Sequence, residues 1–168
     1  TFIIMSELNY AIYDEIKNLK PESRKKYEIP DVAYSALADI MKTQFVKRLD
    51  SSFKAFKQTL ENFVIKLKSK IKQFENGKIY ISSSIKDLNI AEYVLEDREE
   101  EIEDQIMRDL EKGDIYKPED FENNYQEKLL KDYELIKPLY EEWNIIKEDP
   151  KYDLFLYNLI NNFFDKKI

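Results

Sequence analysis

Apolar residues recur every three or four positions through the middle of the chain. The residues that follow this spacing are Leu37, Met41, Phe45, Leu49, Phe53, Phe56, Leu60, Phe63, Leu67, Ile71 and Phe74. Such spacing places side chains on one face of an α-helix. No glycine or proline interrupts the pattern between Asp31, a candidate N-cap, and Gly77. We therefore predict one long helix over residues 31–76, about 40 residues and roughly 60 Å long. Its apolar seam requires antiparallel partner helices.

Shorter patterns precede this helix, in an entry segment over residues 1–30. Residues 1–5 are candidates for a short edge strand, and Ser6 for the N-cap of a helix that stops before Pro21. The apolar positions of that helix are Leu8, Ile12, Ile16 and Leu19.

Residues 77–148 read as acidic helices that return along the long helix. Residues 79–81 form either a short strand or an extended loop. Helices are predicted over 87–112 and from Pro118 onward, with a kink at Pro138. Asp149 and Pro150 then begin a last helix that is apolar on most sides. Such a helix requires neighbours on several faces.

Composition favours the same fold class. The chain of 168 residues has only two glycines, and 36% of its residues are charged, mostly Lys and Glu. We predict a single all-α domain, an elongated bundle with a protruding long helix and at most a minor β element near 79–81 or 1–5. The chain does not begin with Met, and both of its ends are expected to be cut points in a longer polypeptide.

The missing residue types narrow the possible chemistry. There is no cysteine and no histidine, which removes disulfides, thiolate sites and the commonest general base and zinc ligand. Two isolated glycines cannot form a phosphate-binding loop. A Ser-Lys pair and a carboxylate metal site remain formal alternatives only, so we predict no catalytic, cofactor-binding or metal-ligating residue in this chain. No apolar run is long enough to span a membrane, and we expect a cytoplasmic protein.

Charge is distributed unevenly. Residues 41–72 hold nine Lys or Arg against two Asp or Glu, a net charge of +7, whereas residues 87–148 have a net charge of −13. The basic residues contact nucleic-acid phosphates, pair with the acidic helices folded against them, or are solvated on the outer face. The candidates for contact with nucleic acid or a neighbouring domain are Lys47, Arg48, Lys54, Lys57, Lys68 and Lys72. The interleaved phenylalanines lie on the apolar stripe and are expected in the core.

Two segments resemble motifs of large bacterial superfamily II helicases of the Swi/Snf type. Residues 45–61 resemble a helical signature of that family, with Asp50 where Glu is usual and an additional Lys54. Residues 149–156 resemble the helix that opens the second RecA-like lobe. Order and separation match the family. The matching positions are Arg48, Asp50, Ser51, Ser52, Asp149, Pro150 and Lys151.

The resemblance implies that the chain joins the two ATPase lobes of a DNA helicase or translocase, and that residues 149–168 begin the second lobe. ATP and Mg²⁺ would then bind in the flanking lobes. The expected partners are those lobes and double-stranded DNA, with no membrane. Capping and salt bridges at the base of the long helix are the simpler role for residues 47–52. Two other classes remain open, namely a helical protein–protein interaction module and a toxin–antitoxin or phage-type protein.

Overall fold

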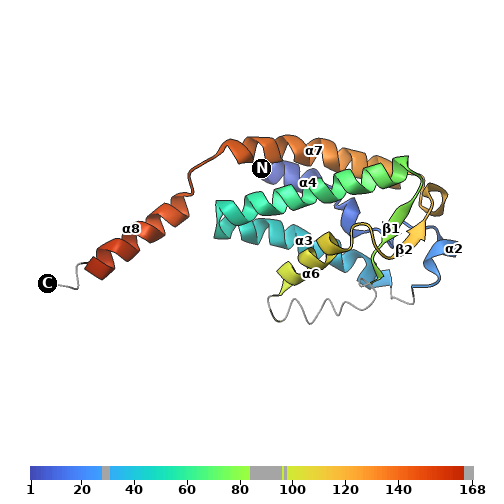
Figure 1. Cartoon of the computed structure of the whole chain (residues 1–168), viewed down its shortest axis with the longest axis horizontal. Helices are drawn as coiled ribbons and strands as arrows, with labels where there is room; N and C mark the ends of the chain where they lie inside the picture. The colour runs from blue at the N-terminus through green and yellow to red at the C-terminus, as the bar shows by residue number, and fades with distance from the viewer. Residues whose placement is uncertain (28–30, 84–95, 97, 165–168) are drawn as a thin grey trace.

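The all-α expectation is confirmed by a computed structural model, which describes residues 1–27, 31–83, 96 and 98–164. Helices α3 (Asp31–Ser51) and α4 (Phe53–Glu75) fill the segment predicted to be one long helix. They are not one straight rod. At Ser52 the backbone is extended, with φ −157° and ψ 149°, and α4 returns alongside α3 as an antiparallel hairpin (Figure 1).

The bend is stabilised locally and by the apolar stripe. The Ser52 side chain accepts a hydrogen bond from the Ala55 backbone N–H at 3.0 Å, which makes it the N-cap of α4. The rings of Phe45 and Phe63 lie 5.3 Å apart between centroids, although a straight helix would separate residues 18 positions apart by about 27 Å. The three- and four-residue spacing continues through Ser52, so periodicity alone could not locate the bend.

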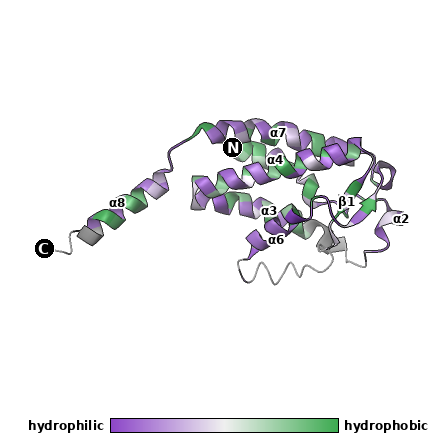
Figure 2. Cartoon of the chain, viewed as in Figure 1, coloured by the Kyte–Doolittle hydropathy of each residue, from purple (hydrophilic) through white to green (hydrophobic). Residues whose placement is uncertain are grey.

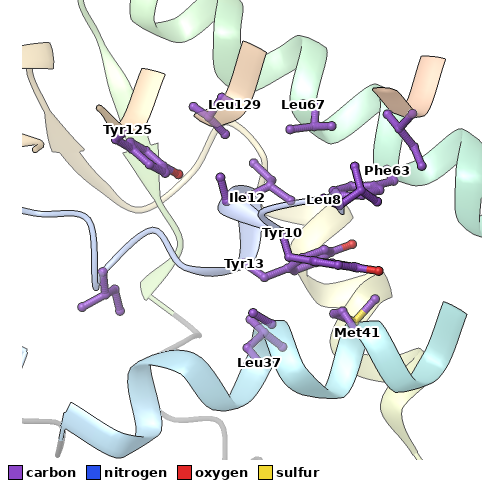
Figure 3. Packing of buried hydrophobic residues seen from close by; sticks show 14 of the residues in the cluster. Leu8, Tyr10, Ile12, Tyr13, Leu37, Met41, Phe63, Leu67, Tyr125 and Leu129 are labelled. Atoms are coloured by element: carbon purple, nitrogen blue, oxygen red, sulfur yellow. The ribbon is translucent and has the colours of Figure 1, made fainter. Parts of the chain in front are cut away.

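The predicted antiparallel packing is present. Helix α7 (Tyr125–Ile145) continues through Pro138 and runs along α4 in the opposite direction (Figure 1). The hairpin and α7 enclose a short 3₁₀ segment, η1 (Ala11–Tyr13), whose neighbour Tyr10 is inserted between the helices (Figure 3). The Tyr10 ring stacks on Phe63 at 5.9 Å and meets Phe45 edge-on at 5.9 Å.

The N-terminal predictions were wrong in secondary structure. Residues 1–5 are not a strand, because helix α1 covers Phe2–Glu7. The helix predicted after Ser6 is interrupted at Tyr10, which has a positive φ of 55°. The buried Asp132 carboxylate accepts hydrogen bonds from the N–H groups of Asn9 and Ala11 at 2.6 and 2.9 Å, so this backbone is satisfied without a helical turn. A short helix, α2 (Pro21–Arg24), follows.

A two-stranded sheet closes the end of the bundle opposite the bend. Strand β1 (Ile79–Ile81) confirms the predicted minor β element, and it pairs antiparallel with β2 (Asp114–Tyr116), which the pattern did not indicate. Gly113 precedes β2 with φ +116°, and a Cβ there would lie 2.1 Å from the Ile81 carbonyl oxygen. Only glycine therefore fits this turn.

The remaining helices differ from the predictions mainly in their limits. Helix α6 (Glu99–Arg108) falls inside the predicted 87–112, of which 87–95 and 97 lie outside the described residues. Pro118 starts a 3₁₀ turn, η3 (Pro118–Asp120), rather than the long helix. The next residue, Phe121, forms an isolated β-bridge with Leu19.

Helix α8 (Pro150–Phe164) begins at the predicted proline and projects from the body (Figure 1). Hydrophobic residues lie along it, away from the packed helices (Figure 2). Six of its large apolar side chains are 41–65% exposed, namely Tyr152, Leu154, Phe155, Tyr157, Leu159 and Ile160. Within the part of the chain that the structure describes, no helix is long and apolar enough to cross a membrane.

Candidate functional site

The two sequence motifs, about 100 residues apart, meet at the bend between α3 and α4. The Asp149 carboxylate accepts the Phe53 backbone N–H at 3.0 Å and the Tyr152 backbone N–H at 3.3 Å. The Lys151 ammonium lies 3.1 Å from Oδ1 of Asp50 and also donates to the Asp50 carbonyl oxygen. We call Asp50, Phe53, Asp149 and Lys151 the clasp.

The clasp satisfies helix ends that the bend leaves open. The last carbonyls of α3 and the first N–H groups of α4 have no partners within their own helices. Lys151 places a positive charge at the C-terminal end of α3, and Asp149 places a negative charge at the N-terminal end of α4, as the two helix dipoles favour. Because Asp149 also caps α8, one carboxylate joins two helix starts. The direction of α8 is thereby tied to the hairpin.

Aromatic packing supports the same end of the bundle. Trp143, near the end of α7, meets the rings of Phe53 and Phe56 edge-on at 5.0 and 4.8 Å. Lys57 donates a hydrogen bond to the Ile146 carbonyl oxygen. These contacts hold the end of α7 and the start of the connection to α8 against α4. The clasp therefore lies beside well-packed aromatic side chains.

The ion pair of the clasp contributes little to stability by itself. The Lys151 and Asp50 side chains are 52% and 88% exposed, and exposed pairs contribute about 0–1 kcal/mol. The hydrogen bonds of Asp149 contribute more, because losing an N-cap costs about 1 kcal/mol. The clasp is thus suited to orienting α8 rather than to holding the fold together.

Arg48, also predicted as a site residue, lies in a separate buried network. Its guanidinium is 3.0 Å from the Glu103 carboxylate and 2.5 Å from the Thr59 hydroxyl. The ammonium of Lys66 lies 3.1 Å from the same carboxylate and donates to the Tyr13 hydroxyl at 2.8 Å. Lys66 and Glu103 are 0% and 2% exposed. We call Arg48, Lys66, Glu103, Thr59 and Tyr13 the buried network.

Burial shapes the ionisation of the buried network. It lowers the pKa of Lys66, against the opposing effect of the Glu103 carboxylate, and the nearby Arg48 lowers it further. Burial, helped by Glu103, raises the pKa of Tyr13 well above its ordinary value. One buried carboxylate therefore faces two cationic side chains, and the largely exposed Glu100 lies 3.6 Å from Arg48 as well.

A second lysine of α4 is also buried. Lys70 pairs with Glu15 and donates to the Tyr80 carbonyl oxygen. Burial raises the pKa of Glu15, and the charge of Lys70 opposes that rise. Of the nine basic residues in 41–72, three therefore point inward to carboxylates, namely Arg48, Lys66 and Lys70. Sequence reasoning had left open whether such residues face solvent or the acidic segments, and no local signal separates the inward lysines from the outward ones.

The structure divides the predicted contact residues into two groups. Four are exposed, namely Lys47, Lys54, Lys68 and Lys72, whereas Arg48 and Lys57 are half-buried, Arg48 against Glu103 and Lys57 against the Ile146 carbonyl oxygen. The half-buried Glu61 and the exposed Ile65 also lie on α4, so the surface of this helix is not uniformly basic.

The remaining motif residues have structural positions. Ser52 caps α4, Ser51 is exposed, and Pro150 occupies the first turn of α8. The Ser52 hydroxyl is engaged as an acceptor in its cap, which leaves it poorly placed as a nucleophile. Among the described residues, no group of three or more Asp or Glu side chains is placed to hold a metal ion.

Comparison with known proteins does not identify a relative of this chain. No protein-family model, no curated protein and no solved structure matches this chain. The clasp and the buried network are therefore the features from which a function must be argued.

Proposed function

We propose that the chain is a non-catalytic helical brace that holds α8, and the domain into which α8 leads, at a fixed angle to the hairpin. The clasp is the observation that supports this function most directly. It joins the end of α3, the start of α4 and the start of α8 through side chains at both motifs. A flexible linker between α7 and α8 would not need polar contacts that join the ends of α3, α4 and α8.

The exposed apolar side chains of α8 support the same proposal. If each large apolar side chain offers about 200 Å² when fully exposed, the six on α8 leave on the order of 700 Å² of apolar surface in water. These side chains lie on several sides of the helix, and a helix that is apolar on most sides requires neighbours on several faces, which supports a covering protein domain. In the helicase interpretation, that domain is the second RecA-like lobe.

The proposed parent is an ATP-dependent DNA helicase or translocase, with ATP and Mg²⁺ bound by its two lobes. In such a motor, ATP binding closes the lobes, and a rigid element between them transmits or limits the movement. The hairpin is a shorter lever than a straight helix would be. It is also stiffer, because α4 packs against both α3 and α7. The alternative is a helical interaction module that presents α8 to a separate protein and has no nucleic-acid role.

Contact with duplex DNA is the second part of the proposal. It is assigned to the exposed lysines Lys47, Lys54, Lys68 and Lys72, and it is weaker than the net charge of residues 41–72 suggests, because three basic residues are turned inward. Weak, salt-sensitive binding is expected from so few phosphate contacts. Fluorescence anisotropy of a labelled duplex at low and moderate salt measures it. No binding at low salt by a variant with all four lysines changed to Gln, together with binding by the wild type, would support the assignment.

The brace is tested in the longer protein. Sequence on either side of residues 1–168 should contain a glycine-rich phosphate-binding loop upstream and a Gln-x-x-Arg-x-x-Arg-type motif downstream; their absence would refute the helicase parent. In that protein, Asp149→Ala should reduce DNA translocation more than DNA-stimulated ATP hydrolysis. Asp153→Ala, the same charge change on α8, is the matched control. Equal loss of both activities in Asp149→Ala would contradict a role in transmitting movement.

A further inference from the structure

Helix α6 is held to the hairpin by few side chains. Of its side chains that the structure describes, only Ile102 and Glu103 are buried. The others are exposed or half-buried, and Arg98 and Glu101 at its start pair with each other at 2.8 Å on the surface. Ten residues form only a marginal helix without tertiary support. Buried side chains are therefore fewer on α6 than on α4 or α7, and sparse burial favours local opening.

The buried carboxylate of α6 occupies a position that suits an anion. Arg48 and Lys66 converge on Glu103 from two different helices, and each also donates a hydrogen bond to a hydroxyl, Arg48 to Thr59 and Lys66 to Tyr13. The Arg48 Nε is buried and has no hydrogen-bond partner among the described residues. A guanidinium binds the oxygens of a carboxylate or a phosphate through the same planar geometry. The set of donors is thus larger than one carboxylate uses.

Opening of α6 would change the charge of the surface below it. While α6 is in place, Glu103 and the largely exposed Glu100, 3.6 Å from Arg48, oppose the two cations. With α6 lifted, Arg48 and Lys66 would meet solvent without either carboxylate. Both would lie on the hairpin that also carries the exposed Lys47 and Lys54. A polyanion that binds only the opened form shifts the population toward it.

We propose that α6 is a removable cover over an anion site, and that the phosphodiester backbone of duplex DNA competes with Glu103 for Arg48 and Lys66. This inference rests on the proposed DNA contact and adds a regulatory step to it. The closed form binds duplex weakly through the outer lysines. The opened form gains two charged contacts, so DNA binding and release of α6 are coupled reciprocally.

The test compares Glu103→Gln with Glu101→Gln in the whole chain, by anisotropy of a labelled duplex over a salt series. Both variants remove one negative charge from α6. The Glu101 carboxylate is exposed and pairs with Arg98, whereas the Glu103 carboxylate is buried against Arg48 and Lys66. Glu103→Gln should tighten binding on the order of tenfold beyond Glu101→Gln and steepen the salt dependence by one to two phosphate contacts. The double variant Arg48→Gln/Glu103→Gln should lose this gain.

A second variant protects the test from a folding defect. Ile102→Ala loosens α6 without changing any charge, and it should also tighten duplex binding while circular dichroism shows the rest of the helices intact. Equal affinities for the Glu101 and Glu103 variants, with Ile102→Ala like the wild type, would overturn the cover and leave contact through the outer lysines standing. If Glu103→Gln binds duplex DNA but the wild type does not, the result supports α6 as a cover over the anion site. It also contradicts DNA contact through the outer lysines in the closed form. If no variant binds at low salt, both proposals fall.

Discussion

The bend at Ser52 predicts an energetic coupling between two phenylalanines that a straight helix would keep far apart. Phe45 on α3 and Phe63 on α4 are both 0% exposed, and their ring centroids lie 5.3 Å apart at an angle of 63°. Aromatic pairs in this geometry contribute about 0.5–1.5 kcal/mol beyond the area they bury. Replacing either ring by Leu keeps an apolar side chain in place and should cost about 1 kcal/mol or somewhat more.

The measurement is a double-mutant cycle on the free energy of unfolding in urea. The variants are Phe45→Leu, Phe63→Leu and the combination of the two. Because each single variant already loses the shared ring contact, the double variant should be less destabilised than the sum by about 0.5–1.5 kcal/mol. The control pairs Phe45→Leu with Phe74→Leu, since Phe74 packs on Phe121 and Tyr125 at the other end of α4. That cycle should be additive within about 0.5 kcal/mol.

Additivity of the Phe45 and Phe63 variants, at the level of the control, would refute the hairpin. In a straight rod the two rings would be about 27 Å apart and could share no neighbour. Coupling of the same size in the control cycle would show a general response of the core rather than a contact across the bend.

Two further predictions concern single positions. Gly113→Ala should destabilise the fold far more than Gly77→Ala. A Cβ at Gly113 would lie 2.1 Å from a carbonyl oxygen, and its φ of +116° lies outside the left-handed helical region, whereas Gly77 has φ +69° and faces open space. The urea midpoints of the two variants measure this difference, and equal midpoints would contradict it. Burial raises the pKa of Glu15 above its ordinary 4.5, so its contribution to stability is present below that pH and is lost as the pH rises through the raised pKa. The difference in unfolding free energy between wild type and Glu15→Gln should therefore fall from pH 4.5 upward, and a difference that grows with pH would show the reverse sign.

Much of the fold could be predicted because helices dominate it. The periodic stripe located α3 and α4, the cap and proline at residues 149–150 located α8, and Ile79–Ile81 was one of two candidates for a minor β element. Each of these depends on neighbours in sequence, which a pattern records directly. The length of the long helix was overestimated because Ser52 interrupts the hydrogen-bond ladder without disturbing the three- and four-residue spacing.

The features that sequence reasoning missed depend on distant partners. Tyr10 takes a left-handed conformation because a carboxylate more than 100 residues away accepts the neighbouring N–H groups. Lys66 and Lys70 are buried because Glu103 and Glu15 reach them from other elements. Nothing in the local pattern of α4 distinguishes these lysines from Lys68 and Lys72, which are exposed. Counting the charges of a helix therefore overstated its basic surface.

The sequence identified the clasp residues but not their relationship. Asp50 and Lys151 were singled out on a resemblance, and the structure brings them within 3.1 Å. Sequence order alone could not show this, since a straight helix would have placed Asp50 in the middle of a rod rather than at its turn. The bend is what turns two separate motifs into one cluster.

The most direct test of the account is the orientation of α8 relative to the hairpin, measured as a distance distribution between spin labels. The chain has no cysteine, so cysteines introduced at the exposed positions Lys68 and Asn158 would carry the labels specifically. If the clasp fixes α8, the distance distribution is narrow for the wild-type background and for Asp153→Ala, and broad for Asp149→Ala. A wild-type distribution as broad as that of Asp149→Ala would contradict the claim that the clasp fixes α8.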